Sequence, residues 1–471
     1  MMTNTLRVSV VATLCGVVWM TTAPVDGLVA VTRFGQGQVD EVSVSLRNAN
    51  AHPRIGLPDF APAPGLDAAL VASSRTVTEV LWSDIDFERE YDMIPRAALA
   101  AVPVAPANAL PYDRWMELNA DFVLAGQASA KGSNLVIQLR LISVKAGDTR
   151  GREYFGVQYE CGMASARAPR DCAHQIADDF HRQLRALDGV ARTKIAFTSD
   201  RDAVRVAGRP SQTAGVGKEI YVADYDGANP LRMTVNRTLN ISPSWSPDGG
   251  LLAYTSYQSG FPDVYVANLR EPGRALGRPA AGTDRAHNQT PAWAPDGSKL
   301  AFASNRAGNL DIWVVNRDGS GLQQLTNHPG ADLAPTWSPD GSQIAFVSDR
   351  AGTNQIYVMN AIGTSQRRLV DQKSDRPTWS SLNFIAFAIG GGSPFDIAIY
   401  DFNTGSIQVL TNGAGTSESP SVSPNGRHIA FFTTRWGRQE IAVMDRTGRR
   451  VKRLTEVGNN TYPNWQPLTR R

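Results

Sequence analysis

The chain has 471 residues, and its 47 basic and 44 acidic side chains leave a net charge of only +3. This balance, with no long basic run, argues against nucleic acid as the main partner. Hydrophobic residues make up 42% of the chain, and 41 glycines and 28 prolines indicate many turns. The composition therefore favours two or three globular, turn-rich domains.

The N-terminal segment carries Arg7 and then an apolar run, Val8–Met20, followed by small residues. The run is too short to span a bilayer comfortably and has the length of a secretory signal core. We expect residues 1–38 to be a targeting segment whose cleavage site the sequence leaves open. A buried strand or an interfacial anchor is the alternative.

Two cysteines remain once that segment is removed, Cys161 and Cys172. In an exported chain an even pair is a disulfide candidate. Closing so short a loop would stabilise the fold by about 3 kcal/mol in the chain-entropy description. Two buried thiols are the alternative.

Residues 53–190 mix two hydrophobic periods. Helical spacing recurs in Gly65–Trp82 and Cys172–Leu187, whereas Asp121–Ala130 and Asn134–Val144 alternate as paired strands do. This mixture predicts one α/β domain. Residues 39–52 precede it as an N-terminal segment that could be flexible.

Residues 191–471 consist of short apolar runs bounded by turn residues. A Pro-x-Trp-Ser-Pro-Asp-Gly motif, complete or degraded, begins at positions 243, 291, 335, 377, 420 and 463. An "Ile-Ala-Phe" run and an "Ile-Tyr-Val" run follow at similar intervals. A period of about 43 residues with several strands per unit is typical of a propeller blade, so the sequence predicts six blades.

The phase of the repeats predicts how the ring closes. The first "Ile-Ala-Phe" run, at Ile195, has no Pro-x-Trp motif before it, and the last motif, at Pro463, has no such run after it. We expect Thr461–Trp465 to be the inner strand of the blade that begins near Ile195. The predicted fold is an α/β N-terminal domain followed by an all-β six-bladed propeller closed by the C-terminal strand.

Recurrence of the motif also indicates a structural role for its tryptophans and aspartates. A tryptophan in this position can wedge between blades, and an aspartate can accept backbone N–H groups of the turn. The residues expected to build the ring are Trp245, Asp248, Trp293, Asp296, Trp337, Asp340, Trp379 and Trp465.

No catalytic or cofactor motif emerges. There is no Gly-x-Ser-x-Gly elbow, and Ala214–Glu219 lacks the first glycine and the hydroxyl residue of a phosphate loop. The propeller histidines His287, His328 and His428 stand at different phases of the repeat, which disfavours a metal site. We expect no catalytic residue and no cofactor, although acidic side chains could hold a cation in the propeller channel.

The order of four elements resembles the TolB family of periplasmic propeller proteins, which belong to the Tol–Pal envelope system. These elements are the repeats, "RIGLPDF" from Arg54, "NADFVLAGQ" from Asn119 with the strand "NLVIQLRL" after it, and "RTKIAFTS" from Arg192. The resemblance implies a periplasmic, non-enzymatic scaffold that supports outer-membrane integrity and cell division. It also implies two partners, a Pal-like peptidoglycan-associated lipoprotein on the propeller and a TolA-like inner-membrane protein on the mature N-terminus.

By that resemblance the N-terminal contact lies in Glu41–Ala51, whose first residues alternate as an added strand should: Glu41, Val42, Ser43, Val44, Ser45 and Leu46. An ordinary first strand of the α/β domain is the alternative. On the propeller, the loops before each Pro-x-Trp motif vary in length, which favours recognition. They supply the candidates His287, Asn288, His328 and Asp332. A second set of loops, Asn305–Leu310 and Asp349–Asn354, is the alternative.

Two other functions fit an exported propeller. One is a periplasmic hydrolase or lyase acting on a polysaccharide or peptide, and the other is a secreted sensor that binds a sugar or peptide.

Overall fold

The structure is a computed structural model that describes residues 52–145, 147, 149–203, 217–269, 286–391 and 394–468, and the backbone of 28–33. The chain forms two compact units, Met1–Ala186 and Leu187–Arg471. Among the described residues, no helix combines the length and hydropathy that a membrane span requires.

The first unit is built on a mixed sheet with the strand order β1-β7-β6-β5-β2-β4, in which β3 pairs with β5. Its strands are β1 (Leu28–Arg33), β2 (Arg54–Gly56), β3 (Ala61–Pro62), β4 (Asp92–Met93), β5 (Phe122–Lys131), β6 (Asn134–Ser143) and β7 (Glu153–Cys161). The long hairpin β5–β6 is antiparallel, and β2 runs parallel to β5. Leu124 and Leu139 of this hairpin are fully buried or nearly so, which gives the unit its apolar core.

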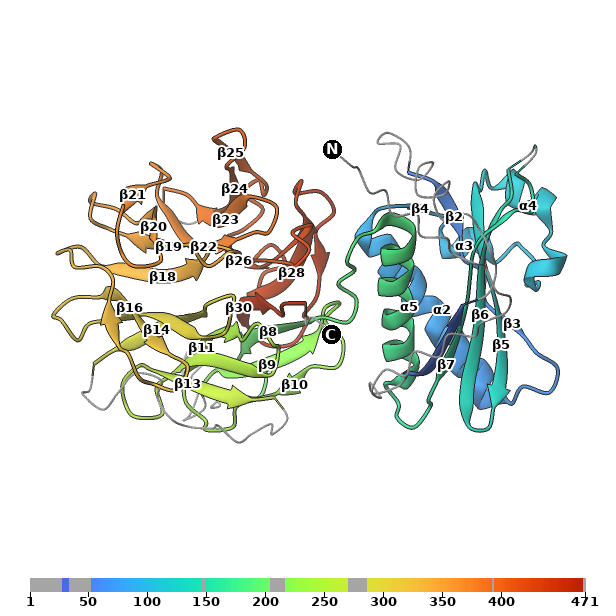
Figure 1. The fold of residues 1–471 in the computed structure, drawn as a ribbon, viewed down its shortest axis with the longest axis horizontal. Coiled ribbons are helices and arrows are strands. Elements are labelled where there is room, and N and C mark those ends of the chain that lie inside the picture. Colours follow the sequence, from blue (N-terminus) through green and yellow to red (C-terminus); the bar gives the residue numbers. More distant parts are fainter. Residues whose placement is uncertain are drawn as a thin grey trace, which may run out of the picture. The chain divides into compact units, whose positions relative to one another are not determined.

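Two long helices, α2 and α5, lie side by side against the sheet (Figure 1). The helices of this unit are α2 (Ala68–Glu88), α3 (Arg96–Leu99), η1 (Ala107–Ala109), α4 (Tyr112–Glu117) and α5 (Ala168–Arg185). Asp67 caps α2 by accepting the N–H of Leu70 at 2.8 Å. Val77, Leu81 and Ile85 form the fully buried stripe of α2. The predicted α/β class is confirmed.

Cys161 at the end of β7 and Cys172 in α5 form a disulfide with a Cα–Cα distance of 5.9 Å. The bond ties the sheet to the helix that packs on it. At the same edge, β1 pairs antiparallel with β7 and places Leu28 opposite Cys161. Part of the predicted targeting segment thus occupies a strand position, so cleavage after Arg33 would remove this edge strand, whereas cleavage before Leu28 would keep it.

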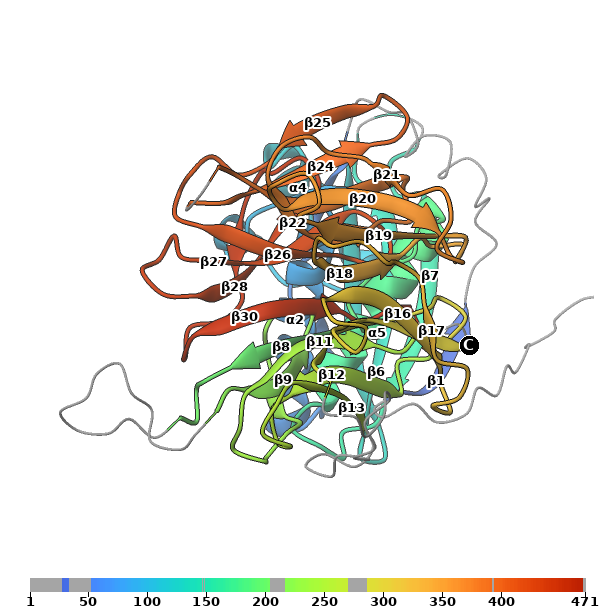
Figure 2. The same ribbon diagram turned by 90° about the vertical axis from the view of Figure 1, so that its left-hand side faces the viewer.

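The second unit consists of six separate sheets, which we number as blades 1 to 6 (Figure 2). The predicted six-bladed propeller is confirmed. Blade 1 contains β30 (Asn460–Trp465), β8 (Lys194–Ser199), β9 (Glu219–Asp224) and β10 (Leu231–Arg232). The described part of blade 2 contains β11 (Asn240–Trp245), β12 (Leu251–Ser256) and β13 (Asp263–Asn268). Blade 3 contains β14 (Asn288–Trp293), β15 (Lys299–Ser304), β16 (Asp311–Asn316) and β17 (Gln323–Gln324).

The remaining three blades follow the same plan, each with four antiparallel strands. Blade 4 contains β18 (Asp332–Trp337), β19 (Gln343–Ser348), β20 (Gln355–Asn360) and β21 (Arg367–Arg368). Blade 5 contains β22 (Ser374–Trp379), β23 (Phe384–Ile389), β24 (Asp396–Asp401) and β25 (Ser406–Val409). Blade 6 contains β26 (Ser417–Val422), β27 (His428–Thr433), β28 (Glu440–Asp445) and β29 (Lys452–Arg453).

The ring closes as the repeat phase predicts. The C-terminal strand β30 pairs antiparallel with β8, with Asn460 opposite Ser199 and Trp465 opposite Ile195. In Figure 2 red β30 lies beside green β8, although the two are the last and the first strands of the propeller. The six inner strands β30, β11, β14, β18, β22 and β26 pack on one another in that order around the ring. Full closure leaves no open sheet edge between blades 1 and 6.

Candidate binding site in the propeller channel

Every inner strand carries a β-bulge at the same point. The register with the second strand shifts just before the proline of each motif, for example between Leu333 and Thr336 in blade 4. At that point all six blades hold a non-glycine residue with φ between 49° and 54°: Ser242, Thr290, Ala334, Arg376, Ser419 and Tyr462. This left-handed conformation costs an ordinary residue roughly 1–2 kcal/mol. A β-bulge changes the direction in which side chains point. Because the same strained bulge recurs in all six blades, we interpret it as a functional feature of the channel wall.

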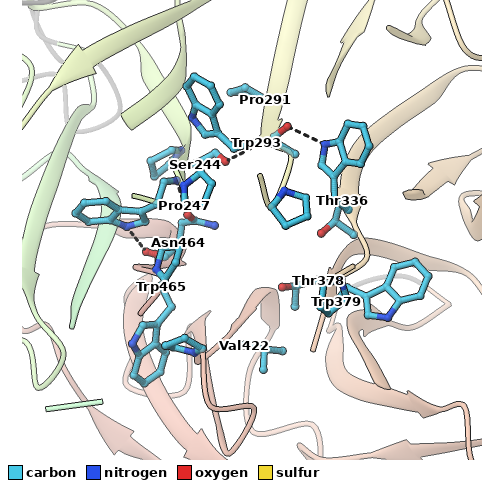
Figure 3. Close-up of a pocket in the computed structure, with 18 of the residues that line it drawn as sticks. Ser244, Pro247, Pro291, Trp293, Thr336, Thr378, Trp379, Val422, Asn464 and Trp465 are labelled. Atoms are coloured by element: carbon cyan, nitrogen blue, oxygen red, sulfur yellow. Dashed lines mark hydrogen bonds between the residues drawn. The ribbon is translucent and has the colours of Figure 1, made fainter. Parts of the chain in front are cut away.

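These six bulge residues line a central cavity of about 940 Å³. The cavity extends to the end of the channel formed by the Ser-Pro-Asp-Gly turns, which we name the turn mouth. The opposite end, where the inner strands begin, is the start mouth. In Figure 3, Thr336, Thr378 and Val422 surround the opening, whereas the ring of Trp379 points away from it.

The tryptophans of the motif connect neighbouring blades. The indole N–H of Trp245 in blade 2 donates to the carbonyl of Asn464 in blade 1 at 3.0 Å, and the Asn464 side chain accepts the backbone N–H of Trp245. The indole N–H of Trp337 in blade 4 donates to the carbonyl of Ala292 in blade 3 at 3.1 Å. These contacts tie blade 2 to blade 1 and blade 4 to blade 3 along the channel wall.

The other three tryptophans are packed in the same layer. Trp465 is 4% exposed and donates from its indole to the Thr193 hydroxyl at 2.7 Å. Trp293 is buried, and Trp379 stacks on Phe402 with 5.3 Å between ring centroids. All of them border the cavity as well, so the motif contributes both to the ring and to the lining of the channel.

The motif aspartates are held by their own turns. Asp340 accepts the Ser338 hydroxyl and the Ser342 N–H, and these hydrogen bonds lower its pKa to about 2. The pKa of Asp248 is lowered chiefly by the Ser246 hydroxyl, and that of Asp296 by the Ser298 N–H. Because these charges already have donors, they are poorly placed for acid–base work.

Two of the predicted partner-binding residues need correction. Asn288 and Asp332, the first residues of their inner strands, are 1% and 0% exposed. The guanidinium of Arg350 donates to both oxygens of Asp332 at 3.0 and 2.8 Å, and Arg306 donates to the Asn288 side-chain oxygen at 3.1 Å. Each arginine also covers the aromatic rings of its own blade, as Arg350 does over Phe346. Asn288 and Asp332 therefore stabilise blades, and a partner cannot reach them.

The two histidines at the start mouth are accessible. His287 is exposed, and its backbone N–H donates to Asn305 at 2.7 Å. His328 is partly exposed, and its Nδ1 accepts the N–H of Gly330 at 2.9 Å. The N-terminal candidates Glu41–Leu46 lie outside the described residues. As for a channel cation, the described residues gather no group of three or more His, Cys, Asp or Glu side chains that could hold a metal ion.

The sequence did not lead us to predict that the bulge residues line the cavity. A clue was present, because the residue before the proline is Ser, Thr, Ala, Arg, Ser and Tyr in successive copies, whereas the proline is constant and the tryptophan after it recurs in five of the six copies. A variable position beside a constant proline is one that the common structural task leaves free.

Family models match both units of the chain. The model described as the TolB amino-terminal domain matches residues 41–149, and the TolB beta propeller domain matches residues 181–469. A Bordetella avium protein named Tol-Pal system protein TolB is 36% identical over 436 residues, covering 91% of this chain and 90% of that protein. A Desulfosudis oleivorans protein of the same name is 32% identical over 238 residues, covering 50% of this chain and 49% of its own length.

The fold matches a solved structure over most of its length. The crystal structure of TolB from Acinetobacter baumannii superimposes with a TM-score of 0.72 and 24% identity, covering 89% of this chain and 98% of that one. At this identity the match speaks for the fold alone.

Proposed function

The chain belongs to the TolB family, and from that premise we propose that it acts in the Tol–Pal system of the periplasm as a binding scaffold. Its relatives are named as components of that system, which favours binding over the hydrolase or lyase alternative. The role is to hold protein partners of the envelope together, in support of outer-membrane integrity and cell division.

The observation that carries the proposal is the channel wall. Six strained bulge residues that differ from blade to blade face one cavity, while the repeated residues around them build the ring. Such a wall offers shape and hydrogen bonds without a nucleophile and its base. A segment of a protein partner that enters the channel would meet the surface that is specific to this chain.

We assign the channel to a Pal-like peptidoglycan-associated lipoprotein. His287 and His328 at the start mouth are proposed as further contacts for a partner that threads the channel. Glu41–Leu46 are proposed as an added strand for a TolA-like inner-membrane protein, after removal of an export signal within residues 1–38.

Calorimetric titration of the full chain with the soluble domain of the Pal-like lipoprotein from the same organism tests the assignment. Thr336→Lys places a long charged side chain in the cavity and should weaken binding at least tenfold. Gln323→Lys on the exposed outer strand β17 is the matched control and should bind within twofold of wild type. A wild-type chain that forms no complex would contradict the proposal.

The start mouth is tested separately with the double change of His287 and His328 to Ala. Loss of affinity in this variant together with Thr336→Lys would support a partner that threads the channel. Loss in Thr336→Lys alone would limit the contact to the cavity, and loss in neither would remove the propeller channel from the interface.

A further inference from the structure

Arg376 crosses the channel. It belongs to β22 of blade 5, and the inner strand opposite β22 in the ring is β11 of blade 2. Its guanidinium nevertheless donates to the hydroxyl of Ser242 in β11 at 3.2 Å and lies 4.5 Å from the ring centroid of Tyr462 in β30. One bulge residue therefore places a positive charge in the middle of the cavity.

This guanidinium has unused hydrogen-bonding capacity. It is half-buried, and it forms no ion pair with any carboxylate of the described residues. Of its five N–H groups one donates to Ser242, and the described residues accept none of the other four. By contrast, the guanidinium of Arg350 donates hydrogen bonds to the buried Asp332 of its own blade. A cation over an aromatic ring with free donors is an incomplete site for an anion.

The nearby acidic groups form no salt bridge with Arg376, although burial raises the pKa of Glu418 and the positive charge of Arg376 acts to lower it. Asp375 accepts the backbone N–H of Arg376, and Glu418 accepts the Thr416 hydroxyl. Neither Asp375 nor Glu418 lines the cavity, whereas Arg376 does. At the turn mouth, the carboxylates Asp248 and Asp296 are occupied by their turns.

Beside the bulges the cavity walls offer few backbone donors, although side chains such as Thr336, Thr378 and Arg317 also line the cavity. Each inner strand presents a proline next to its bulge, and proline has no backbone N–H. The prolines also block the addition of a partner strand to the inner edges of the blades. A peptide in this cavity must therefore be recognised by side chains.

We propose that the cavity selects an Asp or Glu side chain on an extended segment of a protein partner, and that Arg376 is the residue that binds the carboxylate. Two parallel N–H···O bonds to the carboxylate would use donors that no described residue accepts. The identity of the partner rests on the proposed function, but the preference for a carboxylate does not.

The preference is tested with two capped peptides, acetyl-Gly-Glu-Gly-amide and its Gln counterpart, titrated into the full chain and followed by tryptophan fluorescence. On wild type we expect half-saturation by the Glu peptide at a concentration at least fivefold lower than by the Gln peptide. Arg376→Gln should bring the two within twofold, and Arg376→Lys should keep part of the preference. Arg367→Gln on the outer strand β21 is the control and should behave as wild type.

Equal half-saturation by the two peptides on wild type would overturn the inference, as would a preference that survives Arg376→Gln. Should that variant fail to fold, the wild-type ratio and Arg376→Lys still decide. A second titration uses the Pal-like domain, for which Arg376→Gln should weaken binding at least tenfold. If the wild-type chain does not bind that domain but binds the Glu peptide more tightly than the Gln peptide, the proposed function is wrong and the carboxylate site is supported.

Discussion

The first residue of each inner strand is buried, whereas the bulge residue two positions later lines the cavity. The first position is always polar and 0–1% exposed: Asn240, Asn288, Asp332, Ser374, Ser417 and Asn460. The bulge position ranges from Ala334 to Arg376 and Tyr462 and faces the cavity. A repeat protein thus carries its own internal comparison. Positions that recur hold the blades, and the position that varies is available for recognition.

The largest effect should come from breaking the ring at its closure. Deleting residues 460–471 removes β30 and the buried Trp465, and loss of a buried tryptophan alone costs about 3–5 kcal/mol. We expect the melting temperature of the propeller to fall by about 10 °C or more in calorimetry. Deleting only residues 469–471 keeps β30 intact and should shift the melting temperature little. An unchanged melting curve after the longer deletion would refute the closure mechanism.

The next effect sharpens the contrast between recurrent and variable positions. Arg350→Ala leaves the Asp332 carboxylate buried without its cation, which should cost about 3–5 kcal/mol of unfolding free energy in chemical denaturation. Asp332→Asn should cost clearly less, because the equivalent Asn288 already binds Arg306 in the neighbouring blade. If Asp332→Asn lowers the unfolding free energy as much as Arg350→Ala does, then Asp332 and Asn288 do not play equivalent roles in their blades.

The smallest effect concerns the turn aspartates. The pKa of Asp340 in the fold is about 2, below the ordinary value of 3.8. Its contribution to stability is therefore present above about pH 4 and is lost as the pH falls through 2. Asp340→Asn should destabilise by less than about 1 kcal/mol at pH 7, because the carboxylate is exposed and screened. The difference from wild type should shrink in urea unfolding as the pH is lowered toward 2, and a constant difference would argue against a role for the charge.

The repeats alone predicted the blade count and the pairing of β30 with β8, since both follow from the order of short apolar runs. The exposure of Asn288 and Asp332 was misjudged, because loops of irregular length suggested a recognition surface. Applying to the first strand position the recurrence argument already used for the turn aspartates would have indicated burial. The reach of Arg376 across the channel had no local signature, because it depends on which blades face each other in the closed ring.

The pairing of β30 with β8 also determines the order in which the blades can be completed during synthesis. Asp200 and Asn459, which hydrogen-bond beside that pairing, are 259 positions apart. In a chain made from its N-terminus, blade 1 starts first and is completed last, after every other blade has emerged. Until then β8 exposes an unpaired edge that could pair with another chain. The speed with which the C-terminal strand finds β8 should therefore decide how much of the newly made protein escapes aggregation.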